Sequence, residues 1–318
     1  MTRLFSTFTV CLLATALLLV TMVALSGCSV QLIQPLPPPT QPPPAPDPST
    51  VSPATTVTEM VERVNAGDYA GAAELFADDA LLYFVGMPPT GMEVYRGKEQ
   101  FRIFMEECCT GQDFVWEVTP QRLDNAMVYA EAKTWMDFTR ELGVAPNTFH
   151  EVFAVKDGKI TLYHSTMTEE ALAKFKPVLF EAIPELAAFV LPPADLRELP
   201  VNKITVTIAN STCAYDGPLT LQAGPVTVAV DVQDERFEKY AVTAFTLDEG
   251  KDLLDLMAST YNSGPPSWSD MVFFKELAPG ESQIVEGMSV HEGLLYLVCW
   301  ASPPEMPIGN AGPFVVTE

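Results

Sequence analysis

The fold is decided by a stretch at residues 151–160, which reads EVFAVKDGKI. An apolar run leads into Asp157-Gly158, a strong signal for a two-residue type I′ turn. Such a turn pairs Lys156 with Lys159. The stretch therefore predicts an antiparallel β-hairpin, and the chain is read outward from it.

This register predicts which side chains share a face of the hairpin. The expected cross-strand pairs are Val155 with Ile160, Phe153 with Leu162, and Glu151 with His164. All six side chains then lie on one face, because side chains alternate along a strand. If that face lines a pocket, Glu151 and His164 are the acid/base candidates. The alternative is an ion pair at the sheet margin.

The residues before the hairpin predict helices followed by strands. Thr56 and Glu59 fit a capping box that opens an amphipathic helix, which Gly67 ends. A second helix follows Asp68, and a third apolar stripe at helical spacing ends near Gly111. The expected strands are residues 80–85, 114–118, 127–138, 148–156 and 159–166.

This order of helices and strands is accompanied by three short sequence motifs: NAGDY at 65–69, LFADDA at 75–80 and GKE at 97–99. With the hairpin, they make residues 54–176 resemble the SnoaL-like, NTF2-like superfamily. The resemblance implies an α+β cone, in which a bent antiparallel sheet wraps helices around an apolar pocket. It also implies a family of isomerases, cyclases, dehydratases and many non-catalytic domains.

Four aromatic residues are candidates for lining such a pocket: Tyr83, Trp116, Trp135 and Tyr163. Their alternative role is ordinary core packing. No catalytic aspartate–tyrosine or aspartate–histidine set of the family can be matched residue by residue. The sequence thus favours binding of a small apolar ligand or a protein partner, with acid/base catalysis in the cone as the alternative.

The N-terminus carries a targeting signal. Residues 1–27 have a basic start, an apolar run and a small-residue end, and LSGC at 25–28 resembles a bacterial lipobox. The resemblance implies a cleaved signal peptide and lipidation of Cys28 by palmitate-type chains, which gives a membrane-anchored extracytoplasmic lipoprotein. The alternatives are an ordinary cleaved signal or an uncleaved anchor.

Two proline-rich segments separate the folded parts. Residues 28–53 are dense in proline and predict an extended polyproline II tether, the alternative being a docking site for a proline-reading domain. Residues 177–200 form a connector, in which Pro177 and Pro184 are expected to interrupt a helix.

Residues 201–318 change to short strands with turns, a pattern typical of a β-sandwich. One helix is expected over residues 248–257. The strand LYLVC at 295–299, after an APG turn, resembles the cupredoxin-like fold. Cys299 is followed by no histidine, and a blue-copper site needs two imidazoles with the thiolate. We expect neither a metal nor another cofactor.

Apart from Cys28, the cysteines of the mature chain fall into two pairs. Cys213 and Cys299 are expected to form a disulfide outside the cytoplasm, the alternative being two buried thiols. Cys108 and Cys109 end a predicted helix, with Cys108 in the apolar stripe and Cys109 partly exposed.

Charge restricts the partners. The chain has 318 residues, with 41 acidic and 18 Lys or Arg residues, for a formal net charge of −23. Such a surface repels phosphate backbones, so nucleic acid is excluded as a partner. The expected partners are the membrane through the lipid anchor, a small apolar ligand and a cell-surface protein.

Overall fold

The structure is a computed structural model that describes residues 52–87, 91–184, 186, 201–215, 217–260 and 264–318. The signal peptide, Cys28, nearly all of the proline-rich tether and most of the connector lie outside these residues. Residues 46–318 form one compact unit. Within the described residues, no helix is long and apolar enough to cross a membrane.

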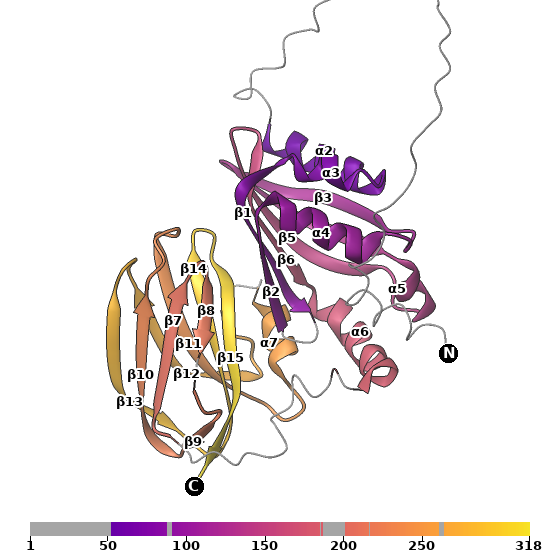
Figure 1. Cartoon of the computed structure of the whole chain (residues 1–318). Helices are drawn as coiled ribbons and strands as arrows, with labels where there is room; N and C mark the ends of the chain where they lie inside the picture. Colours follow the sequence, from indigo (N-terminus) through magenta and orange to yellow (C-terminus); the bar gives the residue numbers. More distant parts are fainter. Residues whose placement is uncertain (1–51, 88–90, 185, 187–200, 216, 261–263) are drawn as a thin grey trace, which may run out of the picture. The chain divides into compact units, whose positions relative to one another are not determined.

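The N-terminal half is a six-stranded sheet with helices on one side (Figure 1). The sheet order is β2-β1-β6-β5-β4-β3, and β1 runs parallel to β6 whereas the other neighbours are antiparallel. The elements are α2 (Pro53–Asn65), α3 (Tyr69–Ala73), β1 (Phe76–Met87), β2 (Gly91–Arg96), α4 (Gly97–Cys109), β3 (Val115–Asp124), β4 (Met127–Trp135), α5 (Asp137–Glu141), β5 (Asn147–Lys156), β6 (Lys159–Met167) and α6 (Glu169–Ala182).

Two helices differ from the sequence prediction at a boundary residue. Ser52, not Thr56, caps α2, because the Ser52 side chain accepts a hydrogen bond from the Thr55 N–H and Pro53 occupies the first turn. Thr56 is buried. Pro177 lies inside α6 rather than interrupting it, so the helix tolerates the loss of one backbone hydrogen bond.

The predicted hairpin turn is confirmed, but the register beyond it is wrong. Asp157 and Gly158 both have positive φ, and Lys156 pairs with Lys159. One residue further on, a β-bulge at Thr161 shifts the pairing, so Ala154 rather than Phe153 faces Leu162.

The C-terminal region consists of two sheets that share one hydrophobic core. Their strand orders are β13-β10-β7-β8 and β12-β11-β14-β15-β9. The elements are β7 (Lys203–Ala209), β8 (Thr212–Tyr215), β9 (Thr220–Gln222), β10 (Gly224–Val232), β11 (Lys239–Leu247), α7 (Leu253–Ser259), β12 (Ser269–Leu277), β13 (Ser282–Val290), β14 (Gly293–Ser302) and β15 (Met306–Thr317).

The expected disulfide between Cys213 and Cys299 is present in this region. It joins β8 to β14, strands of different sheets. Gly309 lies against it, since a Cβ at this position would collide with Cys213. The disulfide therefore ties the two sheets together across the core.

Helix α7 joins the C-terminal region to the first sheet. It begins at Leu253 rather than at residue 248, because Asp252 is the residue whose side chain caps it. Leu253 packs in the core of the C-terminal region, and Leu254 packs in the core of the N-terminal half. The short helix thus contributes apolar side chains to both hydrophobic cores.

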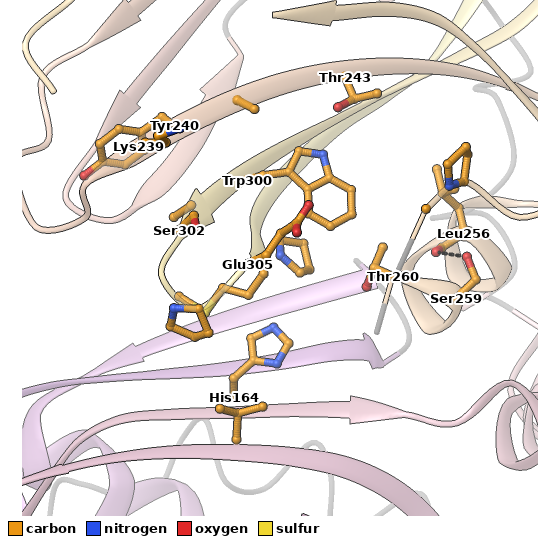
Figure 2. Close-up of a pocket in the computed structure, with 18 of the residues that line it drawn as sticks. His164, Lys239, Tyr240, Thr243, Leu256, Ser259, Thr260, Trp300, Ser302 and Glu305 are labelled. Carbon is orange, nitrogen blue, oxygen red and sulfur yellow. Dashed lines mark hydrogen bonds between the residues drawn. The ribbon is translucent and has the colours of Figure 1, made fainter. Parts of the chain in front are cut away.

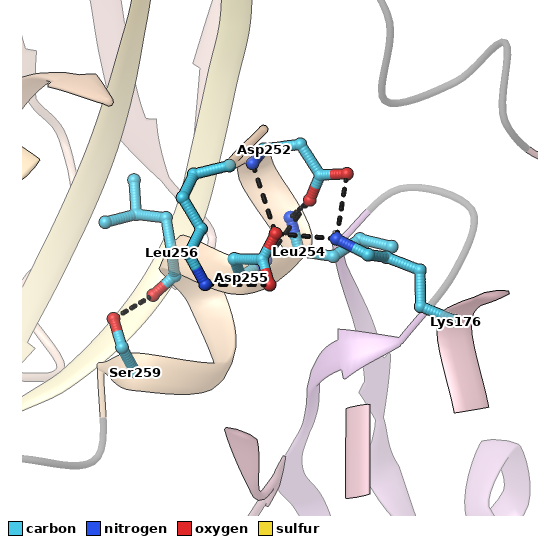
Figure 3. Close-up of polar contacts among 7 residues, drawn as sticks. Lys176, Asp252, Leu254, Asp255, Leu256 and Ser259 are labelled. Atoms are coloured by element: carbon cyan, nitrogen blue, oxygen red, sulfur yellow. Dashed lines mark hydrogen bonds and ion pairs between the residues drawn. The ribbon is translucent and has the colours of Figure 1, made fainter. Parts of the chain in front are cut away.

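A partly buried charge cluster joins this helix to α6 (Figure 3). Lys176 Nζ of α6 lies 3.2 Å from Asp252 and 2.6 Å from Asp255 of α7. The three side chains are only 16–17% exposed. Removing one partner of an ion pair this shielded costs more than removing one partner of a surface pair, because the remaining charge has little solvent around it.

Candidate functional site

The helix-covered face of the first sheet contains a buried polar cluster within an apolar core. Glu151 of β5 lies on this face together with Phe153, because the two alternate with outward-facing residues. Glu151 is 1% exposed. Its Oε1 accepts a hydrogen bond of 2.7 Å from the Tyr163 hydroxyl. A carboxyl is thus held inside the cone.

Tyr163 is positioned by its strand partner. The bulge at Thr161 places it opposite Phe153, and their rings stack with centroids 4.8 Å apart. Trp116 approaches from β3, with its ring centroid 5.8 Å from that of Tyr163. Ser165 pairs with Glu151 across the sheet and so shares its face. Apolar contacts fix the rings around the carboxyl.

The last residue of α2 holds Trp116 in place. Asn65 Nδ2 donates to the Trp116 backbone carbonyl at 2.7 Å, and the Trp116 backbone N–H donates to Asn65 Oδ1 at 2.8 Å. This two-bond match joins the end of a helix to the start of β3. The NAGDY phrase that begins with Asn65 therefore has a direct structural role beside the site.

Burial dominates the electrostatics of the cluster. It raises the pKa of Glu151 to about 8, although the hydrogen bond from Tyr163 and the nearby Trp116 and Ser165 side chains act in the opposite direction. Burial, together with the nearby Glu151 carboxyl, also raises the pKa of Tyr163 well above its usual range. Glu151 is thus mainly protonated at neutral pH and Tyr163 is neutral.

Two polar atoms of the cluster have no hydrogen-bond partner among the described residues. They are Glu151 Oε2 and the Trp116 indole Nε1. Both are buried, and a buried polar group without a partner costs free energy of roughly 1–3 kcal/mol. A protonated carboxyl can donate or accept, whereas an indole only donates. The two atoms therefore keep an unused capacity for hydrogen bonding inside the apolar core.

The predicted pairing of Glu151 with His164 is wrong. His164 pairs with Val152, and both side chains lie on the opposite face of the sheet from Glu151. The cause is the bulge at Thr161, because one inserted residue turns every later side chain of the strand to the other face. Glu151 and His164 therefore do not form an acid/base pair.

The four aromatic candidates also divide between the faces. Trp116 and Tyr163 pack in the hydrophobic core of the cone, which corresponds to the alternative role of core packing. Tyr83 lies on the other face, where its hydroxyl donates to the Ser211 carbonyl at 2.6 Å. Trp135 is half-buried and alternates with the inward-facing Thr134 at the end of β4. The structure brings together only two of the four.

Sequence reasoning missed three residues near the cluster. The predicted register does not place Ser165 on the face of Glu151, because it does not include the bulge. Asn65 is part of the NAGDY motif, which indicates the fold but not a contact with the site. Cys109, expected to be partly exposed, is buried in the cone, whereas Cys108 is half-buried. Hydrogen bonding to Cys108, followed by burial, raises the pKa of Cys109, which makes its thiol unreactive. No group of three or more potential metal ligands occurs in the described part of the chain.

Comparison with known proteins concerns the part of the chain that holds this site. Residues 57–163 match the family model of the SnoaL-like domain, so this part of the chain is similar to that family. No curated protein matches the sequence.

Several solved structures are similar over the same part. An NTF2-like protein of unknown function from Cytophaga hutchinsonii is 15% identical, and the match covers 39% of this chain and 96% of that one with a TM-score of 0.31. An LEH-like epoxide hydrolase from M. tuberculosis is 19% identical over 42% and 96% of the two chains, TM-score 0.31. A putative ketosteroid isomerase from Kribbella flavida is 16% identical over 36% and 76%, TM-score 0.30.

Proposed function

We propose that this chain is a membrane-anchored extracytoplasmic lipoprotein whose cone binds a small, mainly apolar ligand without changing it chemically. The observation that carries the proposal is the buried Glu151 carboxyl with an unpartnered Oε2 beside the unpartnered Trp116 indole. Apolar side chains surround both groups. A ligand with one polar group would satisfy them and bury its apolar part against the core.

The anchoring part of the proposal rests on the N-terminal sequence. LSGC at 25–28 resembles a lipobox, which supports a lipidated Cys28 between a signal peptide and a proline-rich tether. The Cys213–Cys299 disulfide supports an extracytoplasmic location, since disulfides persist in oxidising compartments. On this proposal the protein is attached to the outer face of a cell membrane by its lipids.

We assign the C-terminal region as a cupredoxin-like β-sandwich that serves as an interaction module for a cell-surface protein. Two sheets that share one core are the supporting observation. Cys299 is bonded to Cys213, so it is not the free thiolate that a blue-copper site uses. The net charge of −23 favours a basic partner surface and disfavours nucleic acid.

A second candidate function is acid/base catalysis of the kind found among SnoaL-like isomerases, cyclases and dehydratases. The pKa of about 8 at Glu151 favours it, because a group poised near neutral pH transfers protons efficiently. Tyr163, whose hydroxyl contacts Glu151, would replace His164 as the second group of the site.

One experiment separates the two functions. The full chain is purified in detergent, its bound small molecules are extracted and identified by mass spectrometry, and the extract is re-added in D₂O. A binding protein returns the ligand with unchanged mass. An enzyme that moves a proton to or from carbon returns product or deuterium-labelled ligand, and Glu151→Gln abolishes the change. Extraction of no compound from the wild-type chain would contradict both.

A further inference from the structure

The edge strand β12 of the C-terminal region exposes two large apolar side chains. Met271 is 49% exposed and Phe274 is 56% exposed. Among the described residues, β12 pairs in its sheet with β11 alone, so its other side is an open edge. An exposed apolar edge strand is a template for pairing with a strand of another chain.

A β-bulge determines which face of the sheet each side chain of β12 occupies. The pairing with β11 shifts by one residue between Met271 and Phe273, which leaves Val272 as the extra residue. Val272 and Phe273 consequently both pack against the hydrophobic core. Met271 and Phe274 lie on the other face, which lines a cleft of about 800 Å³ into which Trp300 of β14 points (Figure 2).

The charges of β12 are balanced along the strand. Glu276 is paired with Lys239 of β11 at 3.1 Å. Lys275 has the charge of Glu281 nearby, but neither Lys275 nor Asp270 forms an ion pair within the part of the chain that the structure describes. The open edge therefore carries one unpaired charge of each sign.

A second copy of the strand matches this edge in one antiparallel register. When a two-fold axis passes through the bulge, Met271 faces Phe274 of the second copy and Asp270 faces its Lys275. Each contact occurs twice, because the pair is symmetric. The two members of each pair lie on the same face of the sheet, and both chains contribute the same extra residue at the axis. The bulge therefore does not disturb the register.

Other arrangements lose this match. A shift by one residue places Asp270 opposite Glu276 and Met271 opposite Lys275, so like charges meet and side chains of different faces are paired. The net charge of −23 also opposes association through a surface without local complementarity. A lysine on an edge strand usually discourages pairing, but in the symmetric register Lys275 has an acidic partner.

We propose that the protein forms a symmetric dimer in which β12 pairs antiparallel with β12 of a second copy and joins the two five-stranded sheets into one. The pairs of Asp270 with Lys275 and of Met271 with Phe274 determine the register. One strand pair buries a small area, so we expect a dissociation constant in the micromolar range. The inference does not rest on the ligand proposed for the cone.

The test is sedimentation equilibrium of the full chain in detergent. Asp270→Lys and Lys275→Asp each place like charges at both pairs, and each should weaken dimerisation by at least roughly tenfold. An equimolar mixture of the two variants restores opposite charges at both pairs. The mixture should therefore dimerise about as tightly as the wild type, although neither variant does so by itself.

A matched variant controls for net charge. Glu62→Lys, at an exposed position of α2, changes the net charge by the same amount as Asp270→Lys. It should dimerise at least as tightly as the wild type, because a smaller net charge reduces repulsion between copies. The proposal is overturned if the wild type stays monomeric up to roughly 500 µM. It is also overturned if Asp270→Lys dimerises as tightly as Glu62→Lys, or if the mixture does not associate.

Discussion

Glu151 and His164 lie on adjacent strands of one sheet but point to opposite faces of it. His164 pairs with Val152, and Glu151 pairs with Ser165. One face is covered by helices and buries Glu151 beside Tyr163. The other contributes His164 to a cleft with the C-terminal region. A single bulge therefore places two titratable groups on opposite faces of the sheet.

The first prediction concerns the pH dependence of stability. Glu151 has a pKa of about 8 when folded and about 4.3 when unfolded, so between these values the folded state binds more protons. Its contribution to stability is complete below about pH 4.3 and is lost as the pH rises toward 8, at up to about 1.4 kcal/mol per pH unit. Glu151→Gln should remove this loss, as measured by urea unfolding between pH 6.5 and 9.

The titration of His164 sets the lowest pH at which this stability measurement reports on Glu151 alone. The folded pKa of His164 is about 4 and its unfolded pKa about 6.5, so the unfolded state binds more protons between them. Stability from this group therefore rises with pH up to about 6.5 and is constant above. Glu305→Gln, a change at an exposed carboxylate, is the control. Parallel curves for wild type and Glu151→Gln above pH 6.5 would refute a raised pKa at Glu151.

The second prediction concerns the residue that positions Trp116. Asn65→Ala removes both hydrogen bonds to the Trp116 backbone and should lower the free energy of unfolding by about 2 kcal/mol. Gln233→Ala removes only an exposed contact to Asp231 and should cost less than about 0.5 kcal/mol. Urea denaturation measures both, and equal costs would argue against the role of Asn65.

The third prediction concerns the disulfide. It closes a loop with a sequence separation of 86 residues. Replacing both Cys213 and Cys299 by Ser should lower the free energy of unfolding by about 4 kcal/mol. A reducing agent should lower the stability of the wild-type chain by a similar amount and leave the double variant unchanged. A reductant effect of equal size in both proteins would show that another bond is responsible.

The fourth prediction compares two lysines of α6. Lys176→Met leaves Asp252 without a cation and Asp255 with only Lys251, 3.7 Å away, and should cost about 1–3 kcal/mol. Lys174 is paired with Glu170, but the two side chains are 64% and 82% exposed, so Lys174→Met should cost less than about 0.5 kcal/mol. Thermal unfolding of the two variants distinguishes them. A larger loss at Lys174 would be contrary to the role of the buried cluster.

The sequence predicted the elements well where local patterns determine them. The residue types at Asp157-Gly158 predict the turn, and apolar–polar alternation predicts five strands of the first sheet. The number and positions of the cysteines predict the Cys213–Cys299 pair. Strand β2 is absent from the predicted strands, because Pro88-Pro89 and Gly91 are typical of a turn and the strand lies at the sheet edge. Local chemistry thus predicts elements better than their ends.

The site was harder to predict because it depends on register. A threonine at position 161 is as compatible with a regular strand as with a bulge, so the sequence does not indicate the bulge. The bulge alone decides whether Ser165 or His164 shares the face of Glu151. Likewise, Tyr83 contacts Ser211, 128 residues further along the chain, so its face is decided by packing of the C-terminal region. Pairing across such distances is a tertiary property.

The most direct test of ligand binding in the cone is native mass spectrometry of the full chain released from detergent. We predict that the wild-type protein carries a reproducible extra mass and that Glu151→Leu, which keeps the volume but removes the carboxyl, does not. Lys174→Met is the control and should retain the mass. Identical masses of ligand on the wild type and Glu151→Leu, or a bare wild-type chain, would contradict the account.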